Sequence, residues 1–314
     1  MKKRTISEEL FHELQSGVYH QITDIVKIDP YLDMEMRGDD GVMIYYRGGK
    51  LLTINEDQGL IGLDEEYYLQ KDVVRIVPSA SDPLDYICKA KHVIDLHESG
   101  PKRKLIEKEF QQRVVYENNL SANAINTDYF IADVEWADND ALGGRADIVA
   151  FRWNHMEHKK RLLQLTLIEV KQGDGAIGTY KTIDKRGNSI VSAGLKKHYD
   201  DFIQFSSDMD YVRNVAEDML LVLKQKRDLG LIKGLDKLFC SGTKEILPEL
   251  VDKPDFIFLL ANYHHYSSAL RDECESLPEE SKFYLSSFMG YGLYKDFVLS
   301  KSRLKEVFPL MFRK

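Results

Sequence analysis

Three charged residues interrupt two apolar segments in the middle of the chain. Asp147 lies in residues 144–151, and Glu169 and Lys171 lie in residues 165–171. Both segments are rich in branched residues, which is typical of strands buried in a sheet. Side chains alternate along a strand, so Glu169 and Lys171 share one face, and a neighbouring strand can set Asp147 opposite them. We therefore expect these three side chains to meet on adjacent strands.

Two neighbouring carboxylates are suited to a divalent cation. Asp147 and Glu169, together with the backbone carbonyl of Val170, offer the hard oxygen ligands that Mg²⁺ and Mn²⁺ prefer. Such an ion can stabilise charge on a phosphodiester and lower the pKa of an attacking water. Lys171 can hold that water or the phosphate. The alternative is a structural ion pair, because buried charges must either pair or bind a metal.

The pattern of Asp147 followed by Glu169-Val170-Lys171 resembles the motif of the PD-(D/E)XK superfamily, the restriction-endonuclease-like nucleases. Ala146 stands where the motif has proline. The resemblance, which covers roughly residues 100–262, implies that the motif sits on a β-hairpin in an αβββαβ core with a mixed sheet. It implies that Asp147 and Glu169 bind Mg²⁺ or Mn²⁺ and that Lys171 is catalytic. The implied function is metal-dependent hydrolysis of phosphodiester bonds, with DNA as the favoured substrate.

Two further acidic positions could complete this site. Residues 102–119 have the apolar spacing of a helix, and the resemblance implies an acidic residue on a helix at this place in the chain. Glu107 and Glu109 are the candidates, and we favour Glu109. Residues 129–136 alternate as the first strand of the sheet, and Glu135 near its end could be a further metal ligand. The alternative for each acid is a solvent-facing side chain.

The central segment is basic within an acidic chain. The whole chain has a net charge of −8, whereas residues 152–197 carry ten Lys or Arg and four Asp or Glu, a net charge of +6. A phosphate backbone is expected to lie along this segment. Residues 192–205 read as a helix, and we expect Lys196, Lys197 and His198 near its start to contact nucleic acid. A solvated charged face is the alternative.

The chain is long enough for two domains or for one core with substantial additions. We expect a small acidic α+β domain over residues 1–78, made of a helix over residues 7–27 and a β-meander. A linker over residues 78–83 leads to a nuclease-like domain over residues 84–314. There we expect a long helix over residues 208–230 and a buried parallel strand over residues 255–261. The predicted class is α/β, or α+β taken overall.

Several classes of protein are disfavoured by composition. The 43% hydrophobic and 30% charged content is that of an ordinary soluble protein. The sequence has no apolar run of 18 residues and no apolar segment after its basic start, so we expect no membrane helix, no signal peptide and a cytoplasmic location. Cys88, Cys240 and Cys274 have neither disulfide-framework nor zinc spacing.

Two other function classes are alternatives to the nuclease. A serine or cysteine hydrolase is disfavoured because the sequence has no GxSxG elbow or activated cysteine pattern. A catalytically inactive module of the same fold, binding nucleic acid or a protein partner, is the main alternative. The presence of Asp147, Glu169 and Lys171 together favours the enzyme, since a binding module has no need of all three. The oligomeric state, a homodimer included, stays open.

Overall fold

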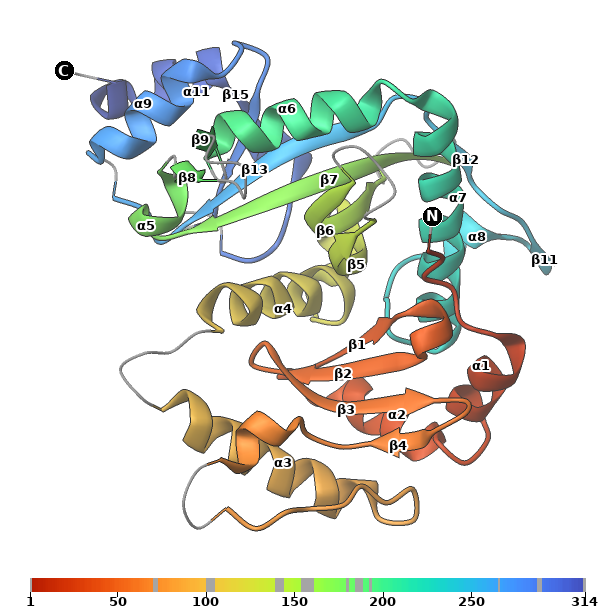
Figure 1. The fold of residues 1–314 in the computed structure, drawn as a ribbon. Helices are drawn as coiled ribbons and strands as arrows, with labels where there is room; N and C mark the ends of the chain where they lie inside the picture. Colours follow the sequence, from red (N-terminus) through yellow and green to blue (C-terminus); the bar gives the residue numbers. More distant parts are fainter. Residues whose placement is uncertain are drawn as a thin grey trace.

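The protein is a mixed α/β structure with two sheets of more than two strands. The computed structural model describes residues 2–69, 73–99, 105–138, 144–153, 161–178, 181–183, 189–191, 194–264, 266–286 and 290–312. Figure 1 shows an amino-terminal unit beside a larger unit that is built on a mixed sheet. Within the described ranges, no helix is both long and apolar enough to cross a membrane.

The amino-terminal unit contains a four-stranded antiparallel meander, as predicted. Its strands follow in the order β1 (Leu32–Met36), β2 (Val42–Tyr46), β3 (Gly49–Asn55) and β4 (Gly59–Ile61). Glycine is required in the turn between β1 and β2, because Gly38 and Gly41 have φ values of +59° and +83°. The last strand of the meander is short, since β4 ends at Ile61 and a 3₁₀ turn, η2 (Glu65–Tyr68), follows.

Three helices cover this meander. The predicted helix over residues 7–27 is wrong in part, because the chain forms two helices, α1 (Glu8–Gln15) and α2 (His20–Ile28), with a break around Gly17. The expected domain boundary also needs correction. Helix α3 (Pro83–Glu98), which we had placed in the second domain, buries Tyr86, Ile87 and Ile94 in the amino-terminal core. This helix therefore belongs with the amino-terminal unit.

The larger unit is built on a mixed sheet with strand order β15-β14-β13-β7-β6-β5. Strands β5 (Tyr129–Ala137), β6 (Arg145–Arg152) and β7 (Leu162–Gln172) form an antiparallel meander. Strand β13 (Asp255–Ala261) runs parallel to β7, as predicted. Strand β14 (Lys282–Leu285) is parallel to β13, β15 (Leu299–Ser300) is antiparallel to β14, and β12 (Glu249–Leu250) pairs with the start of β7.

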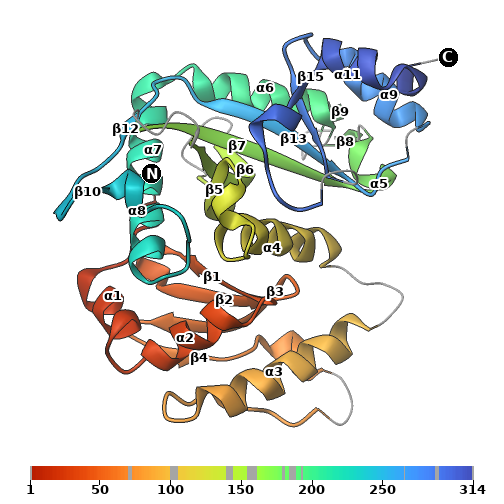
Figure 2. The same cartoon turned by 180° about the vertical axis from the view of Figure 1, so that it is seen from behind.

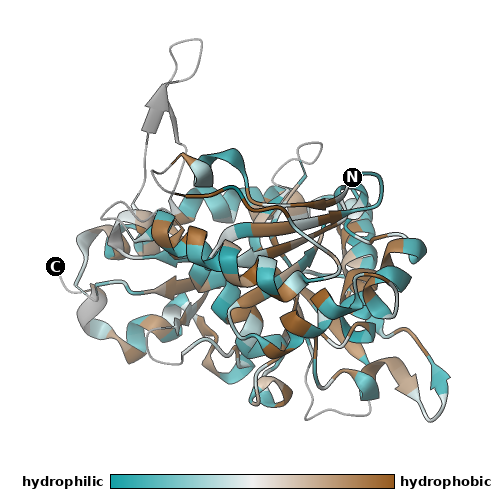
Figure 3. Ribbon diagram, turned by 90° about the horizontal axis from the view of Figure 1, so that it is seen from below, coloured by the Kyte–Doolittle hydropathy of each residue, from teal (hydrophilic) through white to brown (hydrophobic). Residues whose placement is uncertain are grey.

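Helices cover both faces of this sheet. Both views place α4 (Ile106–Asn119) between the sheet and the amino-terminal unit (Figures 1 and 2). Its Phe110 and Val114 pack with Ile148 and Ile168. The opposite face carries α6 (Leu195–Ser206), α7 (Met209–Asp228) and α9 (Ser268–Ser276), whose apolar side chains pack with strand residues such as Leu167 and Phe258. The strands are largely hydrophobic in Figure 3, whereas the helices alternate between hydrophobic and hydrophilic.

The remaining elements are short. Near the carboxyl end, residues 295–297 form a 3₁₀ turn and residues 299–300 pair as β15. The short elements are η1 (Gly38–Asp40), η3 (Ala124–Asn126), α5 (Asp174–Ile177), β8 (Lys181–Ile183), β9 (Ser189–Val191), α8 (Asp236–Phe239), β10 (Cys240–Ser241), β11 (Lys244–Glu245), η5 (Lys295–Phe297), α11 (Lys301–Val307) and η6 (Pro309–Phe312).

Strand β5 departs from the regular alternation that its sequence predicts. Its register against β6 shifts between Ile131 and Asp133, and Glu135 has a φ of +52°. Strict alternation would put Val134 on the same face as Phe130, but Val134 packs on the α4 side and Phe130 on the α6 and α7 side. A bulge places an extra residue in one strand and so reverses the face of Val134. Trp136, which follows the left-handed residue Glu135, lies on the Phe130 side again and packs against Phe205.

Candidate functional site

The site begins where β6 and β7 separate. The last pair of their ladder is Ile148 opposite Ile168, and continuing this register by one residue places Asp147 opposite Glu169. At this point the N–H of Val170 donates to Oδ2 of Asp147 at 2.7 Å. The carboxylate of Asp147 is therefore held against β7 by a backbone donor, in a site where it is 9% exposed.

Glu169 and Lys171 share the face of β7 that α6 covers, as their spacing predicts. Nζ of Lys171 lies 2.6 Å from Oε1 of Glu169. From α6, Nε2 of His198 lies 3.1 Å from the same oxygen and 3.4 Å from Nζ of Lys171. Because the lysine donates and has no acceptor, a neutral His198 can accept one of its N–H groups. The ammonium thus has both a carboxylate and an imidazole within reach.

Burial disfavours the ionised forms of Asp147 and Glu169. Burial raises the pKa of Asp147 well above its usual range, and the charges of Glu169 and Glu107 raise it further, against the lowering effect of Lys171. Burial also raises the pKa of Glu169, and Lys171 opposes that shift. A raised pKa means that the surroundings disfavour the ionised carboxylate. An added cation would therefore stabilise the ionised forms of Asp147 and Glu169.

The acidic residue that α4 contributes is Glu107, so our preference for Glu109 is corrected. Glu109 binds Arg113 at 2.9 Å and Arg47 at 3.5 Å, which turns it toward the amino-terminal unit. Glu107 instead lies near Lys171 and the backbone of Gln172. Burial raises the pKa of Glu107, Lys171 and the backbone of Gln172 lower it, and the charge of Glu135 raises it. Glu107 therefore lies within electrostatic reach of the site.

Glu135 adjoins the site from β5. The pairs Val134 with Ile148 and Trp136 with Ala146 put Glu135 opposite Asp147 in the register. Both acids line a hollow of about 380 Å³. Two side chains of α4 hold the carboxylate, since Nε2 of Gln111 donates to Oε1 at 2.9 Å and Nζ of Lys108 lies 3.4 Å from Oε2. Glu135 is thus a neighbour of Asp147 that is already engaged by two partners.

The predicted nucleic-acid ligands on α6 divide into two groups. Lys196 and Lys197 are on the surface, where they pair with Asp200 and Asp201 one turn along the helix. Lys197 also lines the hollow that contains Asp147. His198 instead points inward to Glu169, so its expected place on the phosphate-binding surface is corrected. Residues 154–160 and 184–188 of the basic segment lie outside the described residues.

The donor set fits a divalent cation that keeps much of its hydration. Among the residues that the structure describes, no three His, Cys, Asp or Glu side chains are arranged to hold a metal by themselves. Mg²⁺ commonly uses one or two carboxylates and completes its shell with waters and substrate phosphate, so Asp147 and Glu169 satisfy that requirement. The backbone N–H of Val170 serves Asp147. A ligand role for the Val170 carbonyl, or for Glu135, stays a prediction.

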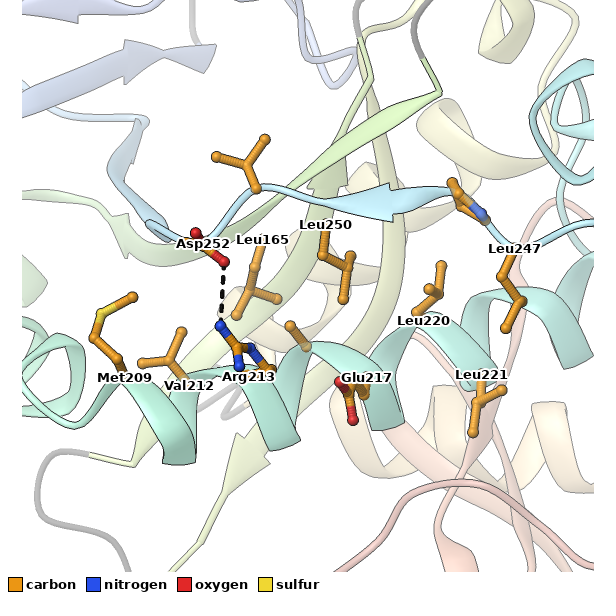
Figure 4. Close-up of a pocket in the computed structure, with 13 residues that line it drawn as sticks. Leu165, Met209, Val212, Arg213, Glu217, Leu220, Leu221, Leu247, Leu250 and Asp252 are labelled. Atoms are coloured by element: carbon orange, nitrogen blue, oxygen red, sulfur yellow. Dashed lines mark hydrogen bonds and ion pairs between the residues drawn. The ribbon is translucent and has the colours of Figure 1, made fainter.

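A second hollow lies away from this chemistry. It has a volume of about 430 Å³ and lies between α7 and residues 247–252 (Figure 4). Its walls are mainly apolar side chains, and Arg213 lies 3.4 Å from Asp252 across it. None of the clustered acids lines it. It therefore takes no part in the site described above.

Comparison with known proteins adds no relative on which a function could be based. No family model matches the chain, and neither a curated protein nor a solved structure matches it. The function is consequently argued from the geometry and charge of the site itself.

The inward position of His198 leads to a prediction about stability. Burial, and then the charge of Lys171, lowers the pKa of His198 from 6.5 to about 3. Between pH 6.5 and about pH 3, His198 is protonated in the unfolded chain and neutral in the folded protein. The stability that the neutral imidazole contributes is therefore present above pH 6.5 and is lost as the pH falls. From pH 8 to pH 5, wild type should lose about 2 kcal/mol of unfolding free energy relative to His198→Asn.

Urea unfolding of both proteins in metal-free buffer at the two pH values measures this difference. His92→Asn, at an exposed position of α3, is the control and should track wild type. An equal gap between wild type and His198→Asn at both pH values would show that the imidazole is solvated and is not held in the site.

Proposed function

We propose that this protein is a metal-dependent nuclease that hydrolyses phosphodiester bonds, with DNA as the favoured substrate. The observation that carries the proposal is the convergence of Asp147, Glu169 and Lys171 where two antiparallel strands separate. A structural ion pair needs one acid for each base. Here Glu107 also acts on the same buried lysine, so the acids exceed what Lys171 alone can balance.

The arrangement of elements supports membership of the PD-(D/E)XK superfamily. Helix α4 precedes β5, β6 and β7, helices α6 and α7 follow, and β13 then lies parallel to β7. This is the order expected of a restriction-endonuclease-like αβββαβ core. Fold alone would not carry a function, because function is located in the site. The proposal therefore rests on the charged residues, with the order of elements as support.

Each residue has a role that follows from its contacts. When bound, Mg²⁺ or Mn²⁺ would stabilise charge on the phosphate and lower the pKa of the attacking water. Asp147, fixed by the Val170 N–H, and Glu169, once released by Lys171, would hold the ion. Lys171 can turn its donors from Glu169 and His198 to a phosphate oxygen, which stabilises charge that develops in the transition state. Glu107, whose pKa is raised by burial, suits proton exchange beside them.

A panel of labelled nucleic acids tests this proposal. Single-stranded and double-stranded DNA and RNA would be incubated with the protein in Mg²⁺, in Mn²⁺ and in EDTA. We expect cleavage of DNA with either metal and none in EDTA. Binding without cleavage of any substrate would instead favour the inactive binding module, and cleavage that EDTA does not inhibit would exclude the proposed chemistry.

The proposed path of the nucleic acid makes a separate prediction about salt. Removing two phosphate contacts from a duplex complex should lower the slope of log affinity against log salt by up to about 1.8. We expect a decrease of about 1 to 1.8 for Lys196→Ala combined with Lys197→Ala, because the phosphates must compete with Asp200 and Asp201. Fluorescence anisotropy in EDTA measures the slope without cleavage.

The control for this experiment is a pair of lysines in the same kind of ion pair elsewhere. Lys27 and Lys89 pair with acids three or four residues away on helices of the amino-terminal unit. Their double alanine variant should keep the wild-type slope. If both double variants behave alike, the lysines of α6 form only a solvated face.

A further inference from the structure

Two arginines of the amino-terminal unit bind strand β5 next to the candidate site. From the end of β1, Arg37 forms an ion pair with Asp133, and its Nη2 donates to the carbonyl of Val134 at 3.2 Å. From the amino-terminal arm, Nε of Arg4 lies 3.0 Å from Oδ2 of Asp133, and its Nη2 donates to the carbonyl of Glu135 at 3.4 Å. Three consecutive residues of β5 are thus bound by these two side chains.

The segment they bind has an unusual backbone. Glu135 has a φ of +52°, a conformation that is uncommon for a residue other than glycine. Such a conformation costs free energy and persists where the surrounding structure fixes it. The contacts of Arg37 and Arg4 to residues 133–135 are the surroundings that can fix it, because they hold the side chain of Asp133 and the two carbonyls that follow.

The arginines are themselves firmly held. Arg37 is 5% exposed, and it lies 3.8 Å from Glu35, which is fully buried and bonded to Lys226 of α7 at 2.7 Å. The backbone N–H of Arg4 donates to Asp218 of α7 at 2.8 Å. A buried charged group with several partners has little freedom to move. The contact to β5 is therefore anchored on α7 as well as on the amino-terminal unit.

The same segment of β5 forms one wall of the candidate site. Glu135 is opposite Asp147 in the register, and both line one hollow. The charge of Glu135 also raises the pKa of Glu107. The path of β5 at residues 133–135 therefore sets the position of β6 at Asp147 and the charge around it.

We propose that Arg37, with Arg4, is a positioning residue for the candidate active site, holding β5 in its left-handed turn at Glu135. The amino-terminal unit would then be part of the enzyme's active architecture and not a separate appendage. The effect on cleavage rests on the proposed nuclease function. The effect on β5 does not, so the two can be tested separately.

The simpler reading is that Arg37 only holds the two units together, and Arg47 provides the control for it. Arg47 also joins the units, since it binds Asp95 of α3 at 2.5 Å and lies 3.5 Å from Glu109 of α4. Its described contacts do not include β5. Losing Arg47 therefore weakens the same interface and leaves the turn at Glu135 untouched.

The first test reads the geometry of β5 without any activity. The chain has two tryptophans, Trp136 and Trp153, so a Trp153→Phe background leaves Trp136, next to Glu135, as the reporter. Trp136 is 1% exposed and packs edge-on against Phe205. In this background, Arg37→Met should raise the acrylamide quenching constant of Trp136 about twofold or more, because the side chain becomes accessible when its strand is released.

Arg37→Lys should lie between wild type and Arg37→Met, since an ammonium restores the charge but not the two-pronged contact. Arg47→Met should match wild type. If Arg37→Met does not fold, Arg4→Met carries the same test, because it removes the bond to the Glu135 carbonyl and leaves Asp133 paired with Arg37. Wild-type quenching in every folded Arg37 and Arg4 variant would overturn the proposal.

The second test reads the consequence for cleavage on whichever substrate wild type cuts. If β5 shifts at residues 133–135, Asp147 on β6 shifts with it. The variant should then lower kcat by about tenfold to 10²-fold, with KM changed less than about twofold. Arg37→Lys should recover part of kcat, and Arg47→Met should keep wild-type values. Equal losses in the Arg37 and Arg47 variants would reduce Arg37 to an interface residue. If wild type cleaves nothing, the proposed function fails, and the quenching of Trp136 still decides the role of Arg37.

Discussion

Lys171→Ala should lower the rate of cleavage by about 10²-fold or more while the protein still binds metal. Nζ of Lys171 lies 2.6 Å from Oε1 of Glu169, and its removal deletes the donor that the proposed function assigns to the phosphate. It also removes a positive charge that would repel the metal, so affinity for Mn²⁺ should persist or increase. Single-turnover cleavage and calorimetric titration with Mn²⁺ measure the two effects.

The matched control for this variant is Lys89→Ala. Lys89 is on the surface of α3 and pairs with Asp85, so its loss should leave single-turnover cleavage within a few-fold of wild type. Cleavage by Lys171→Ala at the wild-type rate would show that Lys171 is a structural partner of Glu169 and not part of the chemistry.

Asp147→Asn should abolish metal-dependent cleavage without destabilising the metal-free protein. Asparagine keeps an oxygen that accepts from the N–H of Val170, and it removes a charge that burial disfavours, as the raised pKa of Asp147 indicates. The melting temperature in EDTA should therefore equal or exceed that of wild type. A ligand at 100 times its Kd stabilises a folded protein by about 2.7 kcal/mol, and the variant should lose this response to Mn²⁺.

Asp255→Asn is the control for the metal response. Asp255 is a similarly buried acid at the start of β13, where it binds Lys282 at 2.6 Å. It pairs in register with Thr166, away from Glu169, so its variant should be less stable in EDTA and yet gain the full stabilisation from Mn²⁺. Loss of the Mn²⁺ response in both variants, or in neither, would contradict the assignment of Asp147 as a ligand.

The central strands and their charged residues were predictable because their signals are local. Apolar runs with branched residues indicate strands, and alternation places Glu169 and Lys171 on one face. The parallel direction of β13 followed from the helical crossover before it. The meander followed from glycines that permit its first turn. In each case a short segment carries the information that determines its structure.

The errors occur where distant contacts decide the outcome. The sequence left both Glu107 and Glu109 as candidates. Only the packing shows that Arg47 and Arg113 bind Glu109, whereas Glu107 lies within electrostatic reach of Lys171. The bulge in β5 cannot be recognised from the sequence, because residues 131–135 contain no glycine. The residues that follow it are bound by Arg4 and Arg37, which are about a hundred or more residues away in the sequence.

The same limit explains the two other corrections. His198 was read as a surface residue because basic neighbours precede it, and its contact with Glu169 depends on how α6 crosses the sheet. Helix α3 was assigned to the second domain because a proline-containing segment precedes it. Its apolar face nevertheless fits the amino-terminal meander. Composition indicates a flexible or turn-rich segment but does not show to which side the next helix packs.

Diffraction from crystals grown with Mn²⁺ tests the central claim most directly. Mn²⁺ scatters anomalously, so a difference map locates the ion independently of any model of its ligands. The account predicts the strongest peak between the carboxylates of Asp147 and Glu169, at about 2.0–2.5 Å from an oxygen of each. Lys171 should then have moved away from Oε1 of Glu169. A map with no peak there, and with Lys171 still bonded to Glu169 at saturating Mn²⁺, would contradict the account and leave the cluster a structural ion network.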